Sequence, residues 1–142
     1  MTSNMLKTTV TLENDRVRFS GTARNNPAVV MDYFPPFGDG NGYSGLEMLL
    51  LSLSDCSATA MTVLLRKMNK RVDGLTVHAT GIRQQTAPYA FTRIDLQYSI
   101  ISPDAGNADA DKAIQLAETS LCPVWAMLKG NVGISVHYTI IS

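Results

Sequence analysis

Residues 44–70 read Ser44-Gly-Leu-Glu-Met-Leu-Leu-Leu-Ser-Leu-Ser-Asp-Cys56-Ser-Ala-Thr-Ala-Met-Thr-Val-Leu-Leu-Arg-Lys-Met-Asn-Lys70. Proline is absent, and Ser44 followed three residues later by Glu47 is a capping box, which predicts a helix that begins here. The first turns are apolar on all sides, and such a helix is normally buried on all sides. A chain of 142 residues has little mass with which to cover it, so we expect an oligomer that shares this helix.

Length and composition bound the class of protein. The 142 residues suggest one domain, residues 1–142, with enough chain for a real core. Twelve basic and twelve acidic residues cancel, which gives no electrostatic reason to expect nucleic acid or an anionic membrane as a partner. We see no signal peptide and no apolar run near the roughly 20 residues of a membrane span. Two cysteines far apart in such a chain favour free thiols in the cytoplasm.

The remaining chain alternates between strand and helix patterns. Apolar and polar residues alternate, as in strands of antiparallel sheets that are covered on one side, in 6–20 (a hairpin), 75–80, 91–100 and 132–140. A further strand is expected at 28–34. Helical spacing follows Asn107, the expected N-cap, through about Leu121, and a short helix follows at 123–128. Runs of strands and helices in this order indicate an α+β fold.

The segment 35–43 is rich in proline and glycine and has no phosphate-binding pattern. It is either a plain connection to the long helix or a lid over the start of that helix.

Two cysteines are the candidates for chemistry. Cys56 is either a small buried hydrophobic residue, as most isolated helical cysteines are, or a reactive thiol. Cys122 precedes Pro123, which places it near the N-cap of the short helix. There the backbone amides and the helix dipole would stabilise a thiolate, although a capping or packing role explains the position equally well.

Other polar residues are candidate partners for these thiols. His78 and His137 fall on polar strand faces, so we expect neither a Cys–His pair nor a metal site, and no cofactor. An arginine can activate a thiol instead, and Arg24, in the turn 21–27, is the most plausible one, whereas Arg16 and Arg18 pattern as solvated strand residues. Glu47 either caps the helix, orients such an arginine, or does both.

Three stretches together resemble the OsmC/Ohr-like family: residues 44–56, residues 91–98 and Leu121-Cys122-Pro123-Val124. The resemblance implies an α+β fold with antiparallel sheets packed on two central helices in an intertwined homodimer. It implies that Cys56 attacks an organic hydroperoxide, that Cys122 resolves the product to a disulfide, and that Arg24 and Glu47 are the activating pair. An external dithiol would then reduce the disulfide in oxidative stress defence.

Details of the pattern place the chain nearer to the less characterised OsmC-like branches. In the organic-hydroperoxide branch the glutamate lies ten residues before the cysteine, whereas Glu47 lies nine before Cys56 and Leu46 takes the tenth position. Two other functions therefore stay open. One is a non-catalytic member of the fold that binds an apolar ligand or partner, and the other is a different thiol-based transferase or hydrolase.

Overall fold

The computed structural model describes residues 4–142, which fall into two compact units that meet in sequence between Leu49 and Leu50. The N-terminal unit holds an antiparallel sheet of β1 (Thr9–Leu12), β2 (Phe19–Thr22) and β3 (Val29–Met31), in the order β1-β2-β3. The predicted hairpin within 6–20 is therefore confirmed. The third strand is shorter than the predicted 28–34, because at Asp32 the backbone turns into a loop.

The loop between β3 and α1 is folded around the carboxylate of Asp32. This carboxylate is 5% exposed and accepts backbone N–H groups from Tyr33 at 2.8 Å, Asn41 at 3.2 Å and Asp39 at 3.3 Å. Burial alone would raise the pKa of Asp32, but these amides and the nearby charge of Arg18 together lower it below its usual value. Ionised Asp32 therefore gives the glycine-rich segment a fixed path.

Arg16 holds the same loop from outside. Its guanidinium donates to the carbonyl of Gly38 at 3.0 Å, to the carbonyl of Pro36 and to the carboxylate of Asp39. Arg16 is exposed, as predicted, but the prediction of a strand position is wrong, since Arg16 lies in the turn between β1 and β2 and binds the loop. The alternation of apolar and polar residues does not show where the turn ends, so it did not reveal that Arg16 lies outside the strands.

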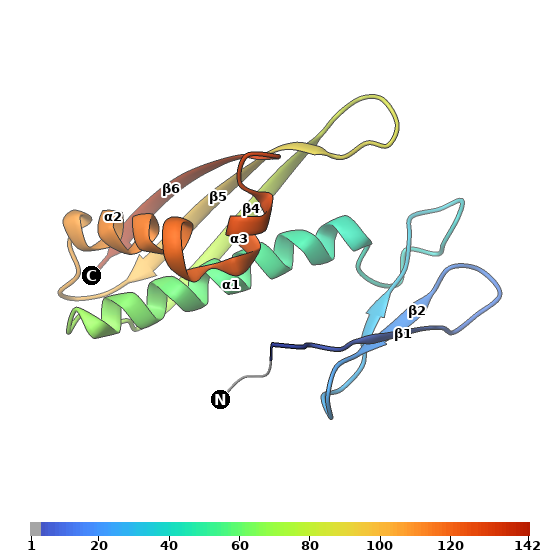
Figure 1. Ribbon diagram of the computed structural model, residues 1–142, viewed down its shortest axis with the longest axis horizontal. Coiled ribbons are helices and arrows are strands. Elements are labelled where there is room, and N and C mark those ends of the chain that lie inside the picture. Colours follow the sequence, from blue (N-terminus) through green and yellow to red (C-terminus); the bar gives the residue numbers. More distant parts are fainter. Residues whose placement is uncertain (1–3) are drawn as a thin grey trace. The chain divides into compact units, whose positions relative to one another are not determined.

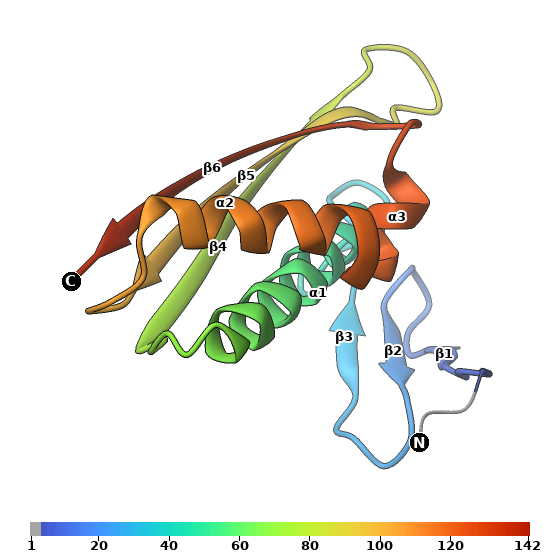
Figure 2. The same ribbon diagram turned by 60° about the vertical axis from the view of Figure 1, so that its left-hand side comes forward.

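The C-terminal unit holds most of the long helix and a second sheet. Its elements are α1 (Gly45–Lys67, which begins in the N-terminal unit), β4 (Gly74–Arg83), β5 (Phe91–Ile101), α2 (Asn107–Leu116), a π-helical turn η1 (Ala117–Leu121), α3 (Pro123–Leu128) and β6 (Gly133–Ile141). The strand order is β4-β5-β6, and α1 and α2 cover one face of the sheet (Figures 1 and 2). The α+β fold is confirmed.

One strand pairing differs from the prediction. β4 and β5 are antiparallel as expected, but β5 and β6 are parallel, with Arg93 opposite Gly133 and Ile101 opposite Ile141. A parallel neighbour needs a long crossover, and α2, η1 and α3 supply it by returning the chain to the end of the sheet where β5 begins. The expectation of purely antiparallel sheets is therefore wrong for this edge.

The core lies between β5 and the helices. Ile94, Leu96, Tyr98 and Ile100 alternate along β5 and are fully buried, as the sequence pattern predicted. The side of α1 that faces this row carries the buried residues Leu53, Ser57, Ala60, Met61, Leu64 and Leu65. Their spacing of three and four residues is that of one helical face.

Within one chain, α1 is not buried on all sides, which corrects the expectation from its first turns. Leu51 is 49% exposed and Val63 is 44% exposed. By length and composition alone α1 would be able to cross a membrane, and 33% of its most apolar window is buried inside the protein. Its uncovered side is an exposed apolar surface.

The helix ends follow local hydrogen bonds. At α1 the predicted capping box is present: Glu47 accepts from the Ser44 amide at 2.9 Å, and Ser44 Oγ accepts from the Glu47 amide at 3.2 Å. At α2 the N-cap is Gly106 and not Asn107, because Asp109 accepts the Gly106 N–H at 2.9 Å. The predicted helix through Leu121 ends its regular part at Leu116.

Candidate thiol site

Cys56 lies at the edge of the buried side of α1. It follows Leu53 by three residues and precedes Ala60 by four, and both of these are buried. The next residue, Ser57, lies about 100° further round the helix and faces the sheet. Cys56 itself is therefore only half-buried, so its sulfur combines an apolar surrounding with access from outside.

Cys122 is placed by two local features of the chain. The π-helical turn ends with a hydrogen bond from the backbone N–H of Cys122 to the carbonyl of Ala117 at 2.9 Å. Pro123 then begins α3, and the Cys122 sulfur accepts the N–H of Trp125 at 3.4 Å as the cap of that helix. The predicted N-cap position of Cys122 is confirmed, and the residue is buried at 2% exposure.

The structure brings the two free thiols together. The side chains of Cys56 and Cys122 lie close enough to influence each other's ionisation, although the cysteines lie 66 positions apart in the sequence. Burial raises the pKa of Cys122 to about 11, and the Cys56 sulfur adds to the rise, whereas the amides of Trp125 and Val124 lower it by less. The N-cap therefore does not make Cys122 a thiolate, and this thiol stays protonated at neutral pH.

A second buried pair lies next to the thiols, and the sequence analysis missed it. The hydroxyl of Tyr98, in β5, donates to Ser57 Oγ at 2.7 Å. Ser57 Oγ in turn donates to the carbonyl of Ser54 at 3.2 Å. The sequence did contain a signal for this pair: a tyrosine on an aliphatic strand face and a serine on an apolar helix face. Buried hydroxyls need hydrogen-bond partners, so two such residues suggest a bond.

Arg24 and Glu47 belong to the N-terminal unit. Arg24 is exposed in the turn between β2 and β3, where its φ of 56° is left-handed, and the described residues offer its guanidinium no hydrogen bond or ion pair. Glu47 is exposed and caps α1 through one carboxylate oxygen. Their roles as an activating pair stay a prediction.

The histidines and acidic residues give no metal centre in the described part of the chain. Among residues 4–142 no group of three or more His, Cys, Asp or Glu side chains could hold a metal ion. His78 in β4 and His137 in β6 are both exposed, on the strand positions that the alternation assigned to the polar face. Neither is buried beside the thiols.

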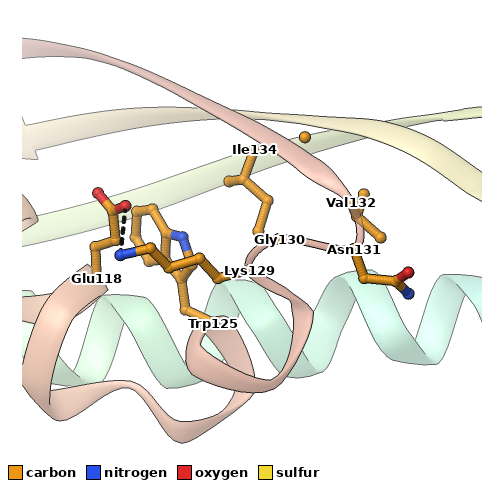
Figure 3. A pocket seen from close by; sticks show the side chains of 8 residues that line it. Glu118, Trp125, Lys129, Gly130, Asn131, Val132 and Ile134 are labelled. Carbon is orange, nitrogen blue, oxygen red and sulfur yellow. Dashed lines mark ion pairs between the residues drawn. The ribbon is translucent and has the colours of Figure 1, made fainter.

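A pocket of about 310 Å³ lies at the end of α3 (Figure 3). Glu118 and Lys129 form an ion pair of 3.2 Å beside it, and Trp125, Val132 and Ile134 also line it. Trp125 links the pocket to the thiol site, since its side chain lines the pocket while its backbone N–H donates to Cys122. The cysteines do not line it.

Two buried groups should make the protein less stable at high pH. Burial raises the pKa of Cys122 from 9.0 to about 11 and that of Tyr98 from 10.0 to about 12. Between these limits the folded state binds more protons than the unfolded chain, so the free energy of unfolding is complete below about pH 9 and falls as the pH rises to about 12. Each group should account for roughly 2–3 kcal/mol of the loss.

Urea unfolding at a series of pH values measures this loss. A Cys122→Ser variant should lack the part that begins near pH 9, because serine does not titrate there. A free energy of unfolding that stays constant up to about pH 11 would contradict the burial of both groups as neutral species.

Comparison with known proteins assigns the family. The family model for OsmC-like protein matches residues 38–137. The chain belongs to the OsmC-like family. Protein YhfA of Escherichia coli (strain K12) is 30% identical to the chain over 99 residues, which cover 70% of this chain and 74% of YhfA.

Solved structures share the fold. An OsmC-like protein from Mycoplasma pneumoniae aligns with a TM-score of 0.84 at 19% identity, over 99% of this chain and 100% of that one. A hypothetical protein from Aquifex aeolicus VF5 aligns at 0.85, with 18% identity over 97% of both chains. An organic hydroperoxide resistance protein from Elizabethkingia anophelis aligns at 0.73, with 18% identity over 98% of both. The predicted OsmC-like resemblance and fold are confirmed.

Proposed function

We propose that this protein is a thiol-dependent hydroperoxide reductase in which Cys56 is the peroxidatic and Cys122 the resolving cysteine. The observation that supports it best is the proximity of the two free thiols, one half-buried and one buried. A substrate reaches the half-buried Cys56, whereas Cys122 is protonated and enclosed. The fold shared with a protein named for organic hydroperoxide resistance agrees with this assignment.

The reaction balances with these two residues and one external reductant. The Cys56 thiolate attacks the distal oxygen of an organic hydroperoxide, the O–O bond breaks, and the alkoxide leaves as the alcohol after it takes up a proton. The Cys122 sulfur then attacks the Cys56 sulfenic acid, the S–O bond breaks, and the Cys122 proton leaves with the hydroxide as water. An external dithiol returns two electrons by exchange through a mixed disulfide.

We further propose that a homodimer completes the site and that Arg24, oriented by Glu47, favours the Cys56 thiolate. An arginine side chain stays charged at every physiological pH, and Arg24 is exposed. Apolar residues on α1 (Leu51 and Val63) and on the N-terminal sheet (Val10, Leu12 and Val30) are between 43% and 55% exposed. A second copy of the chain would cover these residues.

A location in the cytoplasm, where thiols stay reduced, also remains a prediction.

Free-thiol titration before and after one equivalent of cumene hydroperoxide tests the function. We expect rapid loss of both thiols in the wild type, whereas Cys122→Ser should accumulate a sulfenic acid on Cys56 that a dimedone probe captures. Sedimentation velocity of the same sample should report two copies of the 15.4 kDa chain. Survival of both thiols through hours in excess peroxide would reject the reductase.

One observation favours a second candidate, the binding of an apolar ligand. The N-terminal unit has a pocket of about 410 Å³ with mainly apolar lining from Val10, Ala23, Pro27, Val29, Met31 and Met48. If both thiols survive peroxide, ligand extraction and mass spectrometry of the purified protein become the decisive measurement. A bound apolar compound would then establish this alternative.

A further inference from the structure

Tyr98 and Ser57 form a hydrogen bond inside the core that joins β5 to α1. Both residues are fully buried, and the Tyr98 hydroxyl reaches Ser57 Oγ at 2.7 Å. The other members of the buried row on β5 (Ile94, Leu96 and Ile100) are aliphatic, so this hydroxyl is the one polar group of that row. An aliphatic residue at position 98 would save the cost of burying a hydroxyl, which indicates that the bond has a specific task.

The Tyr98–Ser57 hydrogen bond contacts α1 at the turn that carries Cys56. Ser57 follows Cys56 directly, and its own hydroxyl donates back to the carbonyl of Ser54, two residues before the cysteine. The same turn therefore receives a fixed position along β5 and a fixed rotation about the helix axis. Cys122 is close to Cys56 in this turn.

Disulfide formation is sensitive to such positioning. The two sulfurs must approach to about 2.04 Å with a dihedral angle near 90°, and the Cα atoms must lie within about 7 Å. A shift of the Cys56 turn by a fraction of an ångström changes how often this geometry occurs.

We propose that Tyr98 and Ser57 are positioning residues that hold Cys56 in register with Cys122 for disulfide formation. This inference rests on the proposed function, and it concerns the second chemical step: the S–S bond forms, the Cys56 S–O bond breaks, and the Cys122 proton leaves in water. Attack on the hydroperoxide, the first step, does not need Cys122 to be in register with Cys56.

The Tyr98 hydroxyl is suited to a constant role. Burial, with a smaller contribution from nearby Cys122, raises its pKa to about 12, although the bond to Ser57 opposes the rise. Tyr98 therefore keeps its proton, and its donation to Ser57, throughout the physiological pH range. The bond does not itself titrate in the reaction.

The test measures the effective concentration of the Cys56–Cys122 pair in glutathione redox buffers, which needs no peroxide. Tyr98→Phe and Ser57→Ala should each lower it about 10-fold, the size of one buried hydrogen bond. The double variant should lower it no more than the larger single effect, because either single change already removes the bond between the two hydroxyls. Ile100→Val is the matched control, since it destabilises the same strand face without touching the turn, and it should stay within about twofold of the wild type.

Each outcome decides the matter. Values for both single variants within twofold of the wild type, or a double variant whose effect is the product of the singles, would overturn the inference. An equal drop in Ile100→Val would also overturn it, since the effect would then be one of general stability. With peroxide, the variants should form the sulfenic acid at the wild-type rate but condense it more slowly. A wild type in which both thiols survive excess peroxide refutes the proposed function and leaves the glutathione result standing.

Discussion

A Cys56→Ser variant should consume organic hydroperoxide at least about 10³-fold more slowly than the wild type. A serine hydroxyl ionises far above neutral pH and is a much weaker nucleophile toward peroxide oxygen than a thiolate. The buried Cys122 does not replace it, because its raised pKa keeps it protonated and only 2% of it is exposed. Peroxide loss in the presence of excess dithiothreitol, followed by a ferric–xylenol orange assay, measures this rate.

Cys122→Ser is the matched control, because it makes the same replacement of sulfur by oxygen at the other cysteine. Its first turnover should proceed within about threefold of the wild-type rate, since Cys56 remains half-buried and accessible. Its later turnovers should depend on direct reduction of the sulfenic acid by dithiothreitol. Full activity in Cys56→Ser together with none in Cys122→Ser would reverse the two roles.

The features that sequence predicted best are those fixed by neighbours along the chain. The capping box of Ser44 and Glu47 depends on a spacing of three residues, and the structure contains both of its hydrogen bonds. The buried row of β5 depends on a period of two, and Cys122 as an N-cap depends on Pro123 beside it. These signals are local, so one sequence is enough to detect them.

The features that sequence missed depend on contacts between distant segments. Ser57 and Tyr98 lie 41 residues apart, and nothing in either segment alone shows that the two hydroxyls meet. The parallel pairing of β5 with β6 follows from the direction in which the crossover returns, and alternation is the same for parallel and antiparallel strands. The pKa of Cys122 likewise depends on burial and on Cys56 more than on its place at a helix end.

The exposed side of α1 shows a different limit. The sequence indicates that its first turns need to be covered, but it does not say whether the cover comes from the same chain. Leu51 is 49% exposed, so a single copy of the chain leaves part of the apolar surface of these turns uncovered. The expectation that the helix is buried all round is thus wrong for one chain, and it is the physical reason for proposing a second copy.

A Gly38→Ala variant should lower the free energy of unfolding of the N-terminal unit by about 3 kcal/mol. Gly38 is buried in the loop that Asp32 organises, and an added Cβ would lie within 2.8 Å of the Tyr33 amide nitrogen and would overlap the Tyr33 carbonyl and the Asp32 carboxylate. Two of these three contacts are with backbone, which cannot move aside as a flexible side chain would. The loop must open, which also weakens the hydrogen bond from Arg16 to the Gly38 carbonyl.

Gly45→Ala is the control, because an added Cβ there meets no atom within 4 Å and the residue lies in the first turn of α1. Alanine in a helix restricts the unfolded chain more than glycine does, so this variant should be neutral or more stable by up to about 1 kcal/mol. Urea unfolding followed by circular dichroism, with limited proteolysis to detect opening of the loop, compares the two. Equal stability in both variants would mean that Asp32 does not hold the loop closed, because a loop free to move would accept the methyl group at either glycine.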